Sequence, residues 1–139
     1  MDFVLASNSP RRRELLSLLG WQFQVQAADV DETPLDGEPA LAYVQRLAQG
    51  KALAVARQLG NNALILAADT TVSDRDRILG KPASDAEAVS MLRRLRGRRH
   101  QVYTALAVVR TADQRTWQAT CLTEVPMRRY SEAEIQAYV

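Results

Sequence analysis

The chain has 139 residues, of which 47% are hydrophobic and 24% charged, values typical of one globular domain with its own core. A formal charge of +2 is too small to indicate a nucleic-acid partner, and the sequence contains neither a membrane-length apolar run nor a signal-peptide pattern. The single cysteine, Cys121, excludes an internal disulfide and favours a reducing, cytoplasmic compartment.

The first half of the chain alternates strand and helix patterns. In chain order we predict a strand over residues 2–6, a helix over 10–19, a half-buried strand over 21–27, an acidic loop over 28–38, a helix over 39–59, and an apolar strand over 63–68 that ends at Asp69. Ser9 is the predicted N-cap of the first helix, and Gly20 is its stop.

The second half predicts a turn, a helix, a long hairpin and a final helix. The turn lies around residues 74–77, and the helix runs from Ser84 to about Arg96, with Gly97 as its stop. Two strands over 100–110 and 116–127 are joined by a turn at 112–114. Capping boxes begin both helices of this half, with Ser84 paired to Glu87 and Ser131 paired to Glu134.

Three arginines follow Ser-Asn-Ser-Pro at the start of the first predicted helix. Residues 11–13 place positive charge at the positive pole of the helix dipole, which is unfavourable unless an anion binds there. Amide donors, small hydroxyl side chains and arginines at one turn suit a phosphate. The alternative is that the arginines extend into water, each at a small energetic cost.

Both lysines and several carboxylates are further candidates. Of the 18 basic residues only Lys51 and Lys81 are lysine, which indicates positions where a compact ammonium is needed, although chance is a competing explanation. Asp69 follows a buried strand, where α/β sheets place ligands, but such an aspartate often only caps a turn. Asp31 and Glu32 could bind a divalent cation or form a solvated acidic loop.

Other chemistries have little support in the sequence. His100 has no neighbour that completes a triad, Cys121 has no nearby base, and there is no Walker loop or dinucleotide fingerprint. Cations for phosphates together with carboxylates for a metal therefore favour phosphoryl chemistry on a small polyanion.

Seven segments resemble the Maf family of nucleoside triphosphate pyrophosphatases in order and spacing. They are LASNSPRRRELL (5–16), DE (31–32), YVQRLAQGKA (43–52), AADTTV (67–72), LGKP (79–82), MLRRLRGRRHQVYTA (91–105) and SEAEIQAYV (131–139). The resemblance implies an α/β fold, with an elongated mixed sheet flanked by helices, similar to the inosine triphosphate pyrophosphatases. It also implies metal-dependent cleavage of a nucleoside triphosphate into a monophosphate and pyrophosphate.

The resemblance assigns roles to individual residues. Asp69 corresponds to the general base, and Glu32 and Asp69 to the ligands of Mg²⁺ or Mn²⁺. The implied substrate-binding residues are Ser7, Arg11, Arg12, Glu32, Lys51, Thr70 and Lys81. Arg11 and Thr70 stand where members that act on dTTP and UTP have Arg and Thr, whereas members that act on 7-methyl-GTP tend to have Trp and Gln.

Family members continue beyond the Tyr-Val that ends this sequence, so residues 1–139 are expected to form a single Maf-like domain truncated at its C-terminus. The family also implies a house-cleaning role against modified pyrimidine nucleotides and a possible homodimer, with no membrane partner and nucleic acid disfavoured. The competing hypotheses are a non-enzymatic regulator of septum formation and a pyrophosphatase of 7-methyl-GTP.

Overall fold

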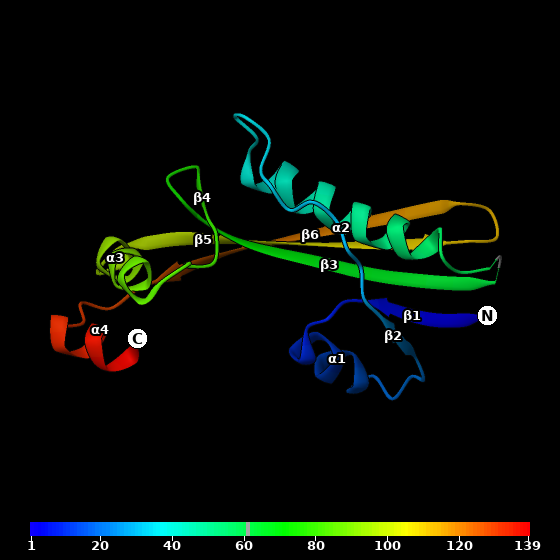
Figure 1. Ribbon diagram of the computed structural model, residues 1–139, viewed down its shortest axis with the longest axis horizontal. Helices are drawn as coiled ribbons and strands as arrows, with labels where there is room; N and C mark the ends of the chain where they lie inside the picture. The colour runs from blue at the N-terminus through cyan, green and yellow to red at the C-terminus, as the bar shows by residue number, and fades with distance from the viewer. Residues whose placement is uncertain (61) are drawn as a thin grey trace.

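The computed structural model describes residues 1–60 and 62–139 and shows a long sheet with helices on both of its faces (Figure 1). The elements are β1 (Asp2–Ala6), α1 (Pro10–Ser17), β2 (Gln24–Gln26), α2 (Ala40–Ala56), β3 (Ala63–Asp74), β4 (Arg77–Leu79), α3 (Asp85–Leu95), β5 (Arg99–Arg110), β6 (Arg115–Pro126) and α4 (Glu132–Tyr138). None of the helices in this part of the chain is long and apolar enough to cross a bilayer.

The sheet is mixed, which confirms the predicted fold class. Within the described residues it has six strands in the order β2-β1-β3-β5-β6, with β4 paired to β3. β1 runs parallel to both β2 and β3, whereas β3, β5 and β6 are antiparallel neighbours and β5 and β6 form the predicted hairpin. The parallel β1–β3 pair places the turn after β1 beside the middle of β3.

Helix α2 packs across β3 and β5 through small side chains. Ala48 and Ala52 on the helix, and Ala67 and Ala107 on the strands, are all buried in one core with Val44. Small residues allow the helix axis to approach the sheet closely. As a result, Lys51, next to Ala52 in the sequence, lies within reach of the strand residues that follow Ala67.

Two predicted strands differ from those observed. β3 does not end at Asp69 but continues to Asp74, because Thr70 and its successors keep pairing with β5 as far as Ser73 opposite Gln101. The strand predicted over residues 21–27 shrinks to β2, and Trp21 is 59% exposed. Trp21 packs edge-on against Phe3, with ring centroids 5.7 Å apart, instead of extending the strand.

The predicted starts of the helices are confirmed, whereas α2 ends at Ala56 and not at residue 59. The Oγ of Ser9 accepts a hydrogen bond from the amide of Arg12, and the Ser131–Glu134 capping box makes both of its bonds. α1 is shorter than predicted, since its last residue is Ser17. The carboxylate of Glu87 accepts from the amide of Ala83, one residue before the expected donor.

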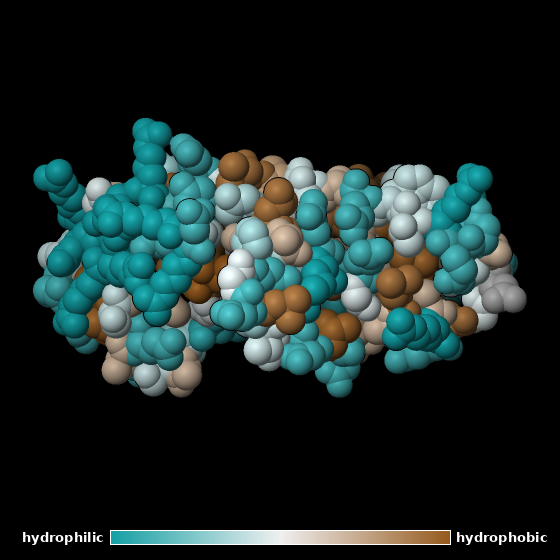
Figure 2. Space-filling view, turned by 90° about the horizontal axis from the view of Figure 1, so that it is seen from above, coloured by the Kyte–Doolittle hydropathy of each residue, from teal (hydrophilic) through white to brown (hydrophobic). Residues whose placement is uncertain are grey.

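A buried carboxylate connects β3 to the end of α3. Asp74 is fully buried, and its two oxygens accept from Arg94 Nε at 2.7 Å and Arg98 Nη2 at 2.6 Å. Burial raises the pKa of Asp74, but the two guanidinium groups outweigh that effect and hold it below its ordinary value of 3.8. Figure 2 shows hydrophilic side chains gathered at this arginine-rich end, whereas apolar patches lie scattered along the rest of the visible face.

We expect Asp74→Asn to destabilise the fold by about 2 kcal/mol at neutral pH, because it removes an acceptor for two charged donors. A carboxyl with a lowered pKa stabilises the fold above its unfolded pKa and loses that effect as the pH falls. The difference in the free energy of unfolding between wild type and Asp74→Asn should therefore shrink below about pH 4. Urea titrations across pH 3–7 measure it. Asp2→Asn, at an exposed site on β1, is the control, and equal effects of the two substitutions would contradict the prediction.

Candidate active site

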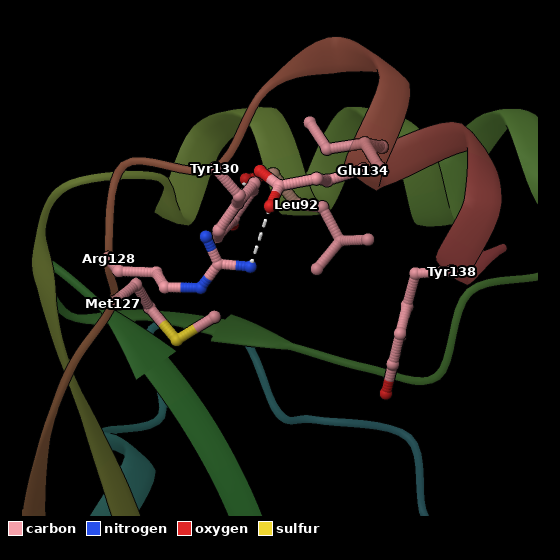
Figure 3. A pocket seen from close by; sticks show the side chains of 7 residues that line it. Leu92, Met127, Arg128, Tyr130, Glu134 and Tyr138 are labelled. Atoms are coloured by element: carbon pink, nitrogen blue, oxygen red, sulfur yellow. Dashed lines mark hydrogen bonds and ion pairs between the residues drawn. The ribbon is translucent and has the colours of Figure 1, made fainter.

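A polar cavity lies where the turn after β1 faces α2 and the segment after β4. It has a volume of about 390 Å³ and is lined by Ala6, Ser7, Asn8, Ser9, Pro10, Arg12, Ala28, Glu32, Lys51 and Lys81. A different pocket, of about 290 Å³, lies between α3 and α4 and is lined mainly by apolar side chains (Figure 3). There Arg128 and Glu134 already bind each other at 3.0 Å, so the cavity beside β1 is the better candidate for an anionic ligand.

The turn between β1 and α1 forms one wall. Ser7, which is buried, accepts a hydrogen bond from the amide of Ser9 at 3.1 Å, and Ser9 accepts from the amide of Arg12 at 3.4 Å. Because these two amides already donate to side chains of the turn, the positively charged side chains contribute the larger part of the attraction for an anion. The guanidinium of Arg12 donates to the carbonyl of Ala68 at 2.8 Å, which fixes the arginine against β3.

Lys51 joins two carboxylates at the centre of the site. Its Nζ lies 2.8 Å from Glu32 Oε1 and 2.7 Å from Asp69 Oδ1. The side chains of Lys51 and Asp69 are 12% and 9% exposed, whereas that of Glu32 is 59% exposed. Helix α2, strand β3 and the acidic loop thus meet at one ammonium group.

The charges in this cluster stabilise one another. The hydrogen bond from Lys51 lowers the pKa of Glu32 against a smaller opposing effect of burial, and Lys81 and Arg12 lower it further. Burial alone lowers the pKa of Lys51, but the bonds to Asp69 and Glu32 outweigh it and raise the pKa. Lys51 and Glu32 are therefore both ionised at neutral pH.

The other predicted site residues lie around this cluster. Ser7, Arg12, Glu32, Lys51 and Lys81 line the cavity itself, and Asp69 contacts it through Lys51. Thr70 is exposed on the adjacent position of β3, where its hydroxyl lies 3.5 Å from Arg12 Nη2 and 3.0 Å from Thr104 Oγ1. Arg11 is exposed and is not among the residues that line the cavity.

The donor set suits a hard divalent cation. Glu32 and Asp69 each direct one carboxylate oxygen at the same ammonium group, so both oxygens face a single positive charge. Mg²⁺ characteristically takes one or two carboxylates and completes its coordination with water and substrate phosphates. Across residues 1–60 and 62–139, no three histidine, cysteine or acidic side chains cluster as a metal site. Glu32 and Asp69 are therefore the residues that could hold such a cation.

Two residues at the site were not predicted from the sequence. Tyr43 donates its hydroxyl to the carbonyl of Glu32 at 2.6 Å, and Thr104 bonds to Thr70. Both lie in segments that resemble the Maf family. They were not predicted because Tyr43 stands at an apolar position of a helix and Thr104 lies within a strand, and both positions are typical of core residues. A signal for Tyr43 was available, because it stands two helical turns before Lys51.

The fold matches solved structures of modest sequence similarity. The Ham1 protein of Staphylococcus aureus superposes with a TM-score of 0.63 at 20% identity, over 91% of this chain and 71% of that one. The HAM1 protein of Coxiella burnetii gives the same TM-score at 18% identity, over 94% and 74% of the two chains. The sheet and its helices therefore define the Ham1 class of α/β fold.

Sequence similarity places the chain within a particular family. Residues 2–139 match the family model described as Maf-like protein, and the chain belongs to that family. A relative from Pelotomaculum thermopropionicum is 46% identical over 99% of this chain and 72% of its own length, and one from Sphingopyxis alaskensis is 50% identical over 98% and 70%. Both relatives are named dTTP/UTP pyrophosphatase.

Proposed function

We propose that this chain hydrolyses nucleoside triphosphates to a nucleoside monophosphate and pyrophosphate, with dTTP, UTP and modified pyrimidine nucleotides as favoured substrates. The observation that carries the proposal is the 42–50% identity, over nearly the whole chain, to relatives named dTTP/UTP pyrophosphatase. The cation-lined cavity beside β1 is consistent with it. The single cysteine is consistent with a cytoplasmic location, and we propose that the protein forms a homodimer.

In this proposal the cations of the cavity bind the triphosphate. Arg12 offers a planar guanidinium already oriented by Ala68, and Lys81, on the segment after β4, is exposed and offers its ammonium to the same cavity. Lys51 contributes a third positive charge, and Ser7 also lines the cavity. Fixed positive charge favours the transition state because negative charge spreads over the phosphoryl oxygens as the bond breaks.

Asp69 is the proposed general base. Its buried carboxylate takes a proton from a water molecule whose oxygen forms a bond to the α-phosphorus, and the bond from that phosphorus to the bridging oxygen breaks. The electron pair leaves with pyrophosphate. The hydrogen bond from Lys51 Nζ to Asp69 Oδ1, 2.7 Å long, orients the carboxylate before the water reacts.

Glu32 and Asp69 are the proposed ligands of Mg²⁺ or Mn²⁺. When bound, such a cation neutralises phosphate charge and supports attack on phosphorus. Lys51 binds one oxygen of each carboxylate, Glu32 Oε1 and Asp69 Oδ1, so a cation that took those same oxygens would displace the ammonium from at least one of them.

Arg11 and Thr70 are the proposed selectors of the base. Thr70 carries its hydroxyl at the edge of the site, and its bond to Thr104 fixes that hydroxyl on β3. Arg11 precedes Arg12 on the first turn of α1, so the two side chains leave the helix about 100° apart, and Arg11 is exposed.

The test is release of pyrophosphate from each of dTTP, UTP, CTP, GTP and 7-methyl-GTP with Mg²⁺ or Mn²⁺. We expect turnover of dTTP and UTP to exceed that of the purine nucleotides by about tenfold or more, the discrimination that a few polar contacts supply. Preference for 7-methyl-GTP would contradict the base assignment. A folded sample without turnover on any of them would favour the non-enzymatic regulator.

A further inference from the structure

The acidic loop that carries Glu32 lies along helix α2 (Figure 1). Near the middle of the helix, Val30 packs beside Gly50, where an added Cβ would lie 3.9 Å from Val30 Cγ1. One and two turns earlier, Arg46 donates to the carbonyl of Thr33 at 3.2 Å and Tyr43 donates to the carbonyl of Glu32 at 2.6 Å. Two consecutive loop carbonyls are therefore bonded to one face of α2.

The same arginine also closes the far end of the loop. Arg46 Nε lies 2.7 Å from Glu38 Oε2 and its Nη2 lies 2.8 Å from Glu38 Oε1, a two-pronged pair. Glu38 Oε1 in turn accepts from the amide of Leu35 at 3.2 Å. The guanidinium carbon of Arg46 lies 5.7 Å from the centre of the Tyr43 ring, so the two side chains also hold each other in place. We name Tyr43 and Arg46 the loop clamp.

The clamp has a consequence for the carboxylate of Glu32. Since the Glu32 side chain is 59% exposed, packing against the core does not determine its position, and its ion pair with Lys51 depends on where the loop backbone lies. We infer that Tyr43 and Arg46 are positioning residues, which fix the loop backbone so that Glu32 reaches Lys51 and, where the proposed function holds, the divalent cation. Neither residue needs to touch the substrate for this role.

The test uses two conservative variants of the full chain. Tyr43→Phe keeps the ring but removes the donor to Glu32, and Arg46→Lys keeps the charge but removes the two-pronged geometry. We expect the amides of Thr33, Leu35 and Glu38, each hydrogen-bonded within the loop, to exchange with deuterium about fivefold faster in either variant. Calorimetric titration of the free protein with Mn²⁺ should show affinity weakened by a similar factor of about five.

Matched controls separate positioning from general loss of structure. Tyr138→Phe changes an 83% exposed tyrosine on α4, and Arg57→Lys changes an exposed arginine at the end of α2, the helix that carries the clamp. Both variants should match wild type in the two measurements. For the clamp variants, kcat at saturating Mg²⁺ should stay within about twofold while the Mg²⁺ concentration for half-maximal rate rises. Unchanged exchange in both variants, or faster exchange with unchanged Mn²⁺ affinity, would overturn the inference. A wild-type protein that is inactive on every nucleotide would refute the proposed function instead, because the exchange measurement does not depend on turnover.

Discussion

Asp69→Asn is expected to reduce pyrophosphate release from dTTP by at least about 100-fold, the lower range for loss of a general base. The substitution keeps the size of the side chain and its place on β3, opposite Ala105. An amide has no basic oxygen of comparable strength to accept the proton from water, and it does not offset the charge of Lys51. The loss should therefore appear in kcat, with a smaller change in KM, when initial rates are measured across dTTP concentrations.

A control and a stability measurement complete this test. Asp36→Asn, in the exposed part of the acidic loop, should retain wild-type turnover within about twofold, as expected for a surface substitution. Asp69→Asn should unfold in the same cooperative transition as wild type, which shows that lost activity is not lost structure. A folded Asp69→Asn protein with more than about a tenth of wild-type turnover would rule out Asp69 as the base, since base catalysis contributes more than that factor.

The elements predicted best are those specified by local chemistry. The Ser131–Glu134 box, the stop at Gly97 with its positive φ of 66°, and the β5–β6 hairpin depend on residues close in sequence. The extension of β3 beyond Asp69 depends instead on four register pairs with β5, from Thr70 opposite Thr104 to Ser73 opposite Gln101, whose members lie 28 to 34 residues apart in the sequence. The β-branched Thr70 and Thr71 are compatible with that extension but do not require it.

The same distinction applies to the site. The helix dipole leads to the prediction of an anion site at residues 11–13, yet sequence alone does not separate Arg12 from its neighbours. In the folded chain Arg12 reaches Ala68, 56 residues away, and this contact depends on the parallel pairing of β1 with β3. Likewise, the rarity of lysine indicated Lys51, but its bonds to Glu32 and Asp69 require α2 to cross the sheet.

Lys51→Met is the second substitution for which we expect a large effect, and it should change two quantities in opposite directions. Methionine fills the space of the lysine stem without its charge, so the triphosphate loses a fixed cation and turnover should fall by about 100-fold or more. Glu32 and Asp69, freed from the ammonium they share, then face each other without a counter-ion. Carboxylates in that situation bind a divalent cation more readily, because no resident charge must be displaced.

Mn²⁺ titration of the free protein decides this second effect. We expect Lys51→Met to bind Mn²⁺ about tenfold more tightly than wild type, the change that corresponds to about 1.4 kcal/mol. Lys81→Met is the matched control: it removes the other lysine, which lines the cavity but contributes only through longer-range charge at Glu32, so its Mn²⁺ affinity should change less. If Lys51→Met binds Mn²⁺ more weakly than wild type, the ammonium does not compete with the cation for these carboxylates. In that case Lys51 helps to organise the metal site, and the proposed displacement of its ammonium is wrong.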